Sequence, residues 1–269
     1  MTATTVMAAT ITIDNVDGIF GQYVPANTAC PRYSNQNAST TDQNQFRYGR
    51  PANDSACPAN LDTDQSGYGF DGRNGSFSVV SETDFLLGDF VHFNRPITIP
   101  FGSTVLTSIP LTYNVRIGGV DYPFTFTANL DETPNSGTCP YPSDTPCSDR
   151  TLFTYVPTQQ VIPITEGGVT NYYILQFSGF GAAGAGNVCP TTPGTLTNTF
   201  ISQEGGERKA CLYARFIFPT TSVQITKTGP ASAVAGATIQ YTLSPLQNTG
   251  PFALTNVRIV DTLPPNMKY

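Results

Sequence analysis

Apolar side chains recur at every second position in one segment after another of this sequence. The pattern is clearest in LTYNVRI at 111–117, YPFTFTANL at 122–130 and CLYARFIF at 211–218. A period of two is typical of β-strands that bury one face. The 24 Gly and 22 Pro residues interrupt the chain between such segments and leave little room for helices. The sequence therefore predicts an all-β fold, an antiparallel β-sandwich of the jelly-roll or Ig-like kind.

Two local features predict how the strands are organised. Gly118 and Gly119 separate two of the alternating segments, and adjacent glycines suit a tight hairpin turn. Near residue 222 the sequence pattern changes: no cysteine follows, and a new series of short alternating segments begins. We therefore expect two domains: a β-sandwich over residues 1–221, and a second, incomplete Ig-like module over residues 222–269.

The charge pattern argues against two classes of partner. The chain has a formal net charge of −6, and only 12% of its residues are charged. Its lysines are few and no basic run occurs, so the electrostatic footprint of a nucleic-acid-binding protein is missing. No apolar stretch approaches the length of a membrane span. We expect neither nucleic acid nor a membrane span to be involved.

Six cysteines indicate the compartment. They are Cys30, Cys57, Cys139, Cys147, Cys189 and Cys211. No CxxC pair occurs and a single histidine cannot complete a zinc site, so disulfides explain the cysteines better than a metal does. Six cysteines allow fifteen connectivities. Sequential pairing is favoured, because each neighbouring pair brackets a Pro-, Gly- or Asn-rich excursion between strands.

Disulfides imply an extracellular location. The opening segment MTATTVMAATITIDNV has no basic region and too short an apolar run for an export signal. We therefore expect a chain whose signal has already been removed.

Several motifs in the first domain resemble one known family. In order, they are FRYGRPA (46–52), SGYGF (66–70), FLLGDFVHFNRPI (85–97), FTANLDETPN (126–135) and SQEGGERKACLYAR (202–215). Together they are similar to the choice-of-anchor K domain of bacterial secreted proteins, including its THxN group. Val91 stands where the name-giving threonine would be, and the cysteine-bearing loops are additional. The resemblance implies a non-catalytic module of the cell exterior.

The end of the chain resembles a second family. Residues 223–269 carry the K-x-G-P, G-x-x-I-x-Y, N-T-G-P and D-T-L-P-P signposts of the Ig-like conserved repeat of prokaryotic surface proteins. An Ig-like sandwich needs about seven strands, and this segment supplies about half of one. We expect either that the remainder lies in a longer natural chain or that a neighbouring subunit completes the module.

Six residues of the motifs are expected to have structural roles. His92 and Asn94 form an H-x-N element that we expect to hydrogen-bond backbone groups where the strand turns before Pro96. Gly67 is expected to serve a backbone turn and Phe70 to pack inward. Glu132, within ETPN, is interpreted as a turn element that bonds nearby amides. A catalytic role for His92 is not favoured, because no activated nucleophile or GxSxG elbow accompanies it.

One segment is a candidate calcium site. Asp62, Asp64 and Ser66 occupy ligand positions one, three and five of a DxDxSG loop. Arg73, however, occupies position twelve, where such loops place a bidentate Glu. A solvated turn is therefore the favoured interpretation, and calcium binding is the alternative. No other cofactor is expected.

A glycosidase pair is not supported. Asp131 and Glu132 are adjacent, and adjacent residues of a strand point to opposite faces. Carbohydrate binding without catalysis remains a hypothesis, in which the aromatic platforms would be tyrosines. The candidates are Tyr68, Tyr122, Tyr141, Tyr172 and Tyr173.

The functional expectation is therefore a non-enzymatic, structural or adhesive module of a bacterial cell surface. Its partners would be further copies of itself or neighbouring surface modules. Assembly into a fibre or surface layer would follow if the N-terminal segment TTVMAATITI paired with the incomplete module of a neighbour by β-strand addition. The alternative is a calcium-dependent carbohydrate-binding module with a glycan as its partner.

Overall fold

The computed structural model describes residues 8–36, 43–134, 137–141, 147–155, 160–218, 223–248 and 258–260. The chain divides into two compact units, Met1–Phe218 and Pro219–Tyr269. The strands of both units pair in antiparallel ladders. Among the described residues, no helix has the length and apolar character needed to span a membrane. The predicted all-β, antiparallel architecture is confirmed.

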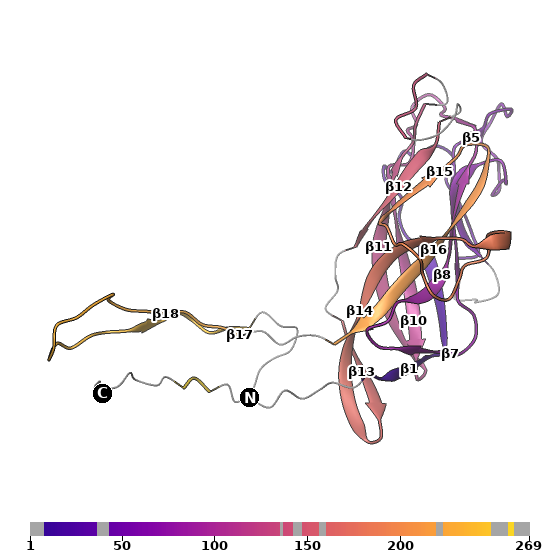
Figure 1. The fold of residues 1–269 in the computed structure, drawn as a ribbon. Coiled ribbons are helices and arrows are strands. Elements are labelled where there is room, and N and C mark those ends of the chain that lie inside the picture. The colour runs from indigo at the N-terminus through magenta and orange to yellow at the C-terminus, as the bar shows by residue number, and fades with distance from the viewer. Residues whose placement is uncertain are drawn as a thin grey trace. The chain divides into compact units, whose positions relative to one another are not determined.

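Unit 1 contains a seven-stranded sheet and a five-stranded sheet. The long strands of both run along the unit (Figure 1). In spatial order, the larger sheet consists of β13 (Val161–Glu166), β14 (Val169–Ala182), β16 (Gly206–Ile217), β8 (Phe85–Asn94), β6 (Ser66–Gly72), β4 (Asn44–Tyr48) and β3 (Arg32–Ser34). The smaller sheet consists of β15 (Thr199–Ser202), β12 (Asp149–Tyr155), β11 (Val120–Asp131), β10 (Ser108–Ile117) and β2 (Asn15–Phe20).

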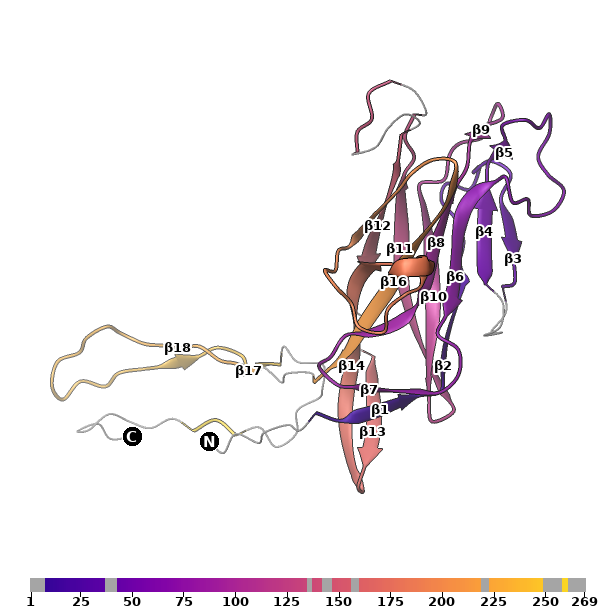
Figure 2. The ribbon, with the colours of Figure 1, turned by 45° about the vertical axis from the view of Figure 1, so that its right-hand side comes forward.

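Short elements complete unit 1. Strand β1 (Thr10–Ile13) pairs with β7 (Phe77–Val80), and β5 (Arg50–Pro51) pairs with β9 (Ile97–Thr98). A 3-10 turn, η1 (Ala185–Asn187), lies in the long connection between β14 and β15. Figure 2 shows β1 and β7 crossing one end of the long strands.

Aromatic side chains fill the space between the two sheets. Phe90 of β8 packs against Phe153 of β12 at a centroid distance of 4.9 Å, and Phe153 packs against Phe180 of β14 at 4.2 Å. Phe126 of β11 is 1% exposed and contacts the same group of rings. Because these rings come from both sheets, burial of their apolar area holds the sandwich together.

Two glycine predictions have different outcomes. Gly118 and Gly119 join β10 to β11 with φ angles of 56° and 79°, as the predicted hairpin turn requires. Gly67, by contrast, lies inside β6 and not in a turn. A Cβ atom there would lie 2.1 Å from the carbonyl oxygen of Phe46, so glycine is needed where β4 approaches β6. Phe70, in the same strand, is fully buried as predicted.

The sequential disulfide pairing is confirmed. Cys30 bonds to Cys57, Cys139 to Cys147 and Cys189 to Cys211, and no cysteine is free. The first two close loops outside the long strands. The third ties the β14–β15 connection to β16, where Tyr213 also donates a hydrogen bond to the carbonyl of Pro190 at 2.6 Å.

Unit 2 has a different character. Its strands β17 (Val223–Gln224), β18 (Lys227–Thr228), β19 (Thr242–Leu243) and β20 (Gln247–Asn248) are two residues long and form two short ladders. Every side chain of this unit whose burial is described is exposed or half-buried, Tyr241, Leu243 and Leu246 among them. The described part of unit 2 therefore has no apolar core of its own.

Candidate functional site

Three motifs that lie far apart in the sequence meet at one end of the sandwich. The H-x-N element is the C-terminal part of β8, Glu132 follows the last residue of β11, and Glu204 lies between β15 and β16. Asp149, the first residue of β12, is the ladder partner of Ser202 in β15. The antiparallel register of β11, β12 and β15 thus brings three carboxylates to the same place.

Glu132, Asp149 and Glu204 form a tight carboxylate cluster. One oxygen atom from each side chain lies within 4.8 Å of those of the other two. Asp149 is 0% exposed, Glu204 is 8% exposed and Glu132 is half-buried. Among the residues that the structure describes, no other group of three His, Cys, Asp or Glu side chains has this arrangement.

Neighbouring hydrogen bonds orient two of the three carboxylates. The Asp149 Oδ1 atom accepts from the Thr133 backbone N–H at 2.8 Å and from the Thr133 hydroxyl at 3.1 Å. The Tyr48 hydroxyl donates to Glu132 Oε2. Asp149 Oδ2 and both oxygens of Glu204 are buried and have no hydrogen-bond partner within the described parts of the chain. Three acceptor atoms in the cluster are thus left unused.

Burial disfavours the charged form of each carboxyl group. It raises the pKa of Glu204 to about 7, with the charge of Asp149 adding to the effect and that of Arg95 opposing it. Burial and the neighbouring carboxylates also raise the pKa of Glu132, and burial raises that of Asp149 against the two Thr133 hydrogen bonds. Without a compensating ligand, Glu132 and Glu204 hold protons near neutral pH much more readily than ordinary glutamates do.

The H-x-N element supports the loop that carries Glu204. The Asn94 Nδ2 atom donates to the backbone carbonyl of Ser202 at 2.9 Å, and the Gly205 N–H donates to the Asn94 carbonyl at 2.9 Å. The predicted bonding of Asn94 to a backbone group is confirmed. Pro96 follows the end of β8, and its carbonyl accepts from the Ala52 N–H at 3.2 Å.

His92 differs from the expectation in its partner. Its Nδ1 atom bonds to the Ser202 hydroxyl, not to a backbone group, and its ring stacks on Tyr68 at 4.8 Å. It sits within β8, where it pairs with Arg208, and not at a turn. Burial, with a smaller contribution from the charge of Arg47, lowers its pKa to about 3. His92 is therefore a neutral imidazole between the sheets.

The pairing of His92 with Ser202 resembles a nucleophile and its base, but burial separates it from substrates. Both residues are 0% exposed. The Nε2 atom of His92 is also buried, and no described residue forms a hydrogen bond with it. A hydrolytic Ser–His pair requires access of substrate to the hydroxyl and a third group that orients the imidazole. This conformation provides neither.

The predicted calcium loop is folded as a turn. The Asp64 N–H donates to Asp62 Oδ1 at 2.9 Å, and the Gln65 N–H donates to the Asp62 carbonyl at 3.2 Å. Ser66 is fully buried, and its hydroxyl donates to the Phe93 carbonyl at 2.9 Å. The hydroxyl of Ser66 thus has a protein partner already, while calcium binding by Asp62 and Asp64 stays a prediction.

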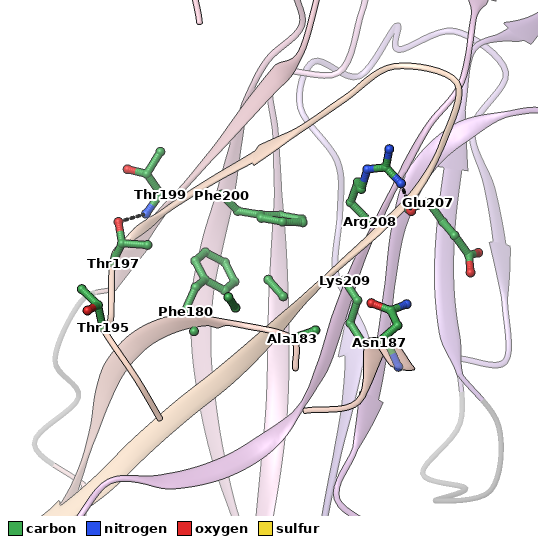
Figure 3. Close-up of a pocket in the computed structure, with 13 residues that line it drawn as sticks. Phe180, Ala183, Asn187, Thr195, Thr197, Thr199, Phe200, Glu207, Arg208 and Lys209 are labelled. Carbon is green, nitrogen blue, oxygen red and sulfur yellow. Dashed lines mark hydrogen bonds between the residues drawn. The ribbon is translucent and has the colours of Figure 1, made fainter. Parts of the chain in front are cut away.

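A cavity of about 520 Å³ lies beside the β14–β15 connection. Figure 3 shows the rings of Phe180 and Phe200 close together in it, with Thr195, Thr197 and Thr199 on one side and Arg208 on the other. Of the tyrosines proposed as sugar platforms, Tyr68 and Tyr173 are fully buried and cannot serve. Phe180 is only 2% exposed, so a ligand of the cavity would instead meet Phe200 and the threonine side chains.

Comparison with known proteins assigns no function to the carboxylate cluster or to the cavity. A scan against protein-family models found no match, and a search of curated proteins also found none. The sequence motifs point to Glu132 but not to Asp149 or Glu204 of the same cluster, nor to Tyr48 and Ser202, which bond to Glu132 and His92. Glu204 lies within the EGG motif, and that motif was the one available signal.

Proposed function

We propose that this chain is a non-enzymatic, extracellular module of a bacterial cell surface, with a structural or adhesive role. One observation carries the proposal: all six cysteines are paired in three disulfides around an all-β sandwich. Disulfides persist in oxidising compartments and are rare in the cytosol. The resemblances to a choice-of-anchor K domain and to an Ig-like surface repeat support the same role.

The test is to locate the native protein. Antibody labelling of intact, unpermeabilised cells followed by electron microscopy is expected to place the label on the cell surface. Peptide mapping without reductant is expected to recover the three disulfide-linked peptide pairs. Label confined to the cell interior, together with free thiols in the native protein, would contradict the proposal.

Assembly by β-strand addition is a finer hypothesis, and the fold restricts it. Strand β1 pairs with β7 of the same chain, and Ile11 and Ile13 are fully buried. Donation of this segment to a neighbour would require β1 to leave unit 1. Deletion of residues 1–10 removes the first residue of β1, whereas deletion of residues 1–7 leaves that strand intact. Light scattering across a concentration series should show loss of assembly only for the longer deletion.

Carbohydrate binding is the second candidate function, and the cavity favours it. The partly exposed ring of Phe200, with nearby hydroxyl and charged groups, suits the mixed apolar and polar faces of a sugar. A glycan array with and without chelator tests binding and its cation dependence. Arg208→Ala, at the cavity, is expected to weaken any binding, whereas Arg116→Ala, in the exposed ion pair with Asp121, is the matched control.

A further inference from the structure

The carboxylate cluster formed by Glu132, Asp149 and Glu204 contains more acceptor atoms than the described residues satisfy. Buried polar atoms without partners are costly, and a bound ion is one of the explanations for a site that retains several of them. Here they include both oxygens of Glu204, whose side chain is 92% buried, and Asp149 Oδ2. A ligand for these atoms must be a hydrogen-bond donor or a cation.

The charge balance favours a divalent cation. Arg95 is the charged neighbour that opposes the carboxylates, acting on Glu204. Three ionised carboxylates beside one guanidinium leave an excess of two negative charges. Burial of unpaired charges costs several kcal/mol per ion, so this excess requires either protonation or a counter-charge. One divalent cation would neutralise it.

The ligand chemistry narrows the choice of cation. The donors are carboxylate oxygens alone, and these prefer hard cations such as Ca²⁺ and Mg²⁺. In a coordination shell with bonds of about 2.4 Å, two ligand atoms are at most about 4.8 Å apart. The oxygens of the cluster meet this limit. Mg²⁺ usually keeps several of its waters, whereas Ca²⁺ accepts irregular, protein-rich shells, which suits a buried site.

The surroundings of the cluster resemble the support that metal ligands usually have. Carboxylates that bind metals are commonly held by further hydrogen bonds on their other oxygens. Thr133 holds one oxygen of Asp149, and Tyr48 holds one oxygen of Glu132. The Glu204 loop is tied to β8 by the two hydrogen bonds of Asn94. The free oxygens are therefore oriented before any cation arrives.

From this geometry we infer that Glu132, Asp149 and Glu204 bind one Ca²⁺ ion between β11, β12 and the β15–β16 loop. The ion joins three connections of the sandwich at the end where the carboxylates replace the apolar core. It is distinct from the loop of Asp62 and Asp64, the candidate calcium site that the sequence suggests. Its role is to stabilise this end of an extracellular module, where free Ca²⁺ is abundant.

The experiment uses the full chain, stripped of metal with EDTA and dialysed against metal-free buffer at pH 7.5. Addition of CaCl₂ at about a hundred times the Kd is expected to raise the Tm by roughly 5–10 °C. Glu204→Gln, which keeps the side-chain shape, is expected to abolish that rise. Asp62→Asn is the matched control, and it should retain the full rise.

Terbium luminescence is a second readout, which measures ion binding without relying on a change in the Tm of the protein. Tb³⁺ replaces Ca²⁺ in oxygen-rich sites and emits when a nearby tyrosine is excited. Tyr48, in direct contact with Glu132, is the expected donor in a chain without tryptophan. Wild-type protein should give a saturable emission that Ca²⁺ displaces, and Glu204→Gln should give at least a tenfold weaker signal.

Three results would overturn the inference. The first is a Tm that CaCl₂ leaves unchanged, together with no saturable Tb³⁺ emission. The second is loss of both responses in Asp62→Asn but not in Glu204→Gln, which would place the ion in the other loop. The third is a Glu204→Gln protein that equals wild type in its response to Ca²⁺. In each case the cluster would instead hold protons.

Discussion

The middle of the sandwich and its acidic end are closed by different physical means. In the middle, rings from both sheets interlock, as Phe90, Phe153 and Phe180 do at centroid distances of 4.2–5.6 Å. At the acidic end, the carboxylates of Glu132, Asp149 and Glu204, from the end of β11, the start of β12 and the β15–β16 connection, take the place of apolar side chains. The apolar side chains of the middle have no charge that a ligand would have to balance. The acidic end must bind protons or a cation, and so its stability depends on solution conditions.

The largest expected effect comes from the middle. Phe90→Ala removes a fully buried ring that contacts four other aromatic side chains from both sheets. We expect the free energy of unfolding to fall by about 3–5 kcal/mol. Urea denaturation measures the change. Phe101→Ala is the matched control, because Phe101 is fully exposed, and it should change stability by less than about 0.5 kcal/mol. Equal effects of the two substitutions would contradict the assigned core.

Removing each of two disulfides distinguishes effects on the global free energy of unfolding from effects on Ca²⁺ binding at the acidic end. The Cys30–Cys57 bond has a sequence separation of 27 and the Cys139–Cys147 bond a separation of 8. The chain-entropy model gives losses of about 3.5 and 2.5 kcal/mol when each pair is replaced by alanines. The smaller loop, however, connects Glu132 to Asp149. Removal of the Cys139–Cys147 bond should therefore also weaken Ca²⁺ binding, whereas removal of the Cys30–Cys57 bond should not.

Urea denaturation and calcium titration of the two double variants test this prediction. A variant lacking Cys30–Cys57 that loses its Ca²⁺ response while remaining folded would contradict the separation. A variant lacking Cys139–Cys147 with unchanged Ca²⁺ affinity would show that the loop does not position the carboxylates.

His92 is expected to give unit 1 a sensitivity to acid. Its folded-state pKa of about 3 lies below the ordinary histidine value of 6.5. The unfolded chain therefore binds a proton more readily than the folded chain does. The stability due to neutral His92 is present above pH 6.5 and is lost as the pH falls from 6.5 toward 3, by on the order of 1 kcal/mol per pH unit.

His92→Gln isolates this effect from those of the carboxylates. The variant keeps a hydrogen-bonding side chain beside Ser202 but cannot be protonated in this range. At pH 7.5 we expect it to cost about 1–3 kcal/mol for imperfect bonding of buried groups. The difference from wild type should shrink as the pH is lowered to 4. A constant difference across this range would show that His92 is not held neutral.

The smallest expected effect concerns unit 2. The described side chains of unit 2 include none that is buried, and we expect the stability of unit 1 not to depend on them. A protein ending at residue 218 should have the same Tm as the full chain to within about 2 °C. Differential scanning calorimetry measures it. A drop of ten degrees or more would show that the two units depend on each other.

The repeating features of the fold were predictable from the sequence, but the site was not. Strands β10 and β11 follow from a period of two and the Gly118–Gly119 turn, and the disulfides follow from local spacing. The carboxylate cluster depends on ladder register, because Asp149 reaches Glu204 only through its pairing with Ser202. No local pattern in the sequence encodes that register. The DxDxSG segment was more conspicuous because its residues are contiguous.

The central claim is that the acidic end binds one Ca²⁺ ion. Native mass spectrometry of the full chain, after exposure to CaCl₂ and removal of excess salt, counts the bound ions directly. Wild-type protein should carry one Ca²⁺ per chain, and Glu204→Gln should carry none under the same conditions. Wild-type protein that carries no Ca²⁺, or a Glu204→Gln protein that still carries one, would contradict the account.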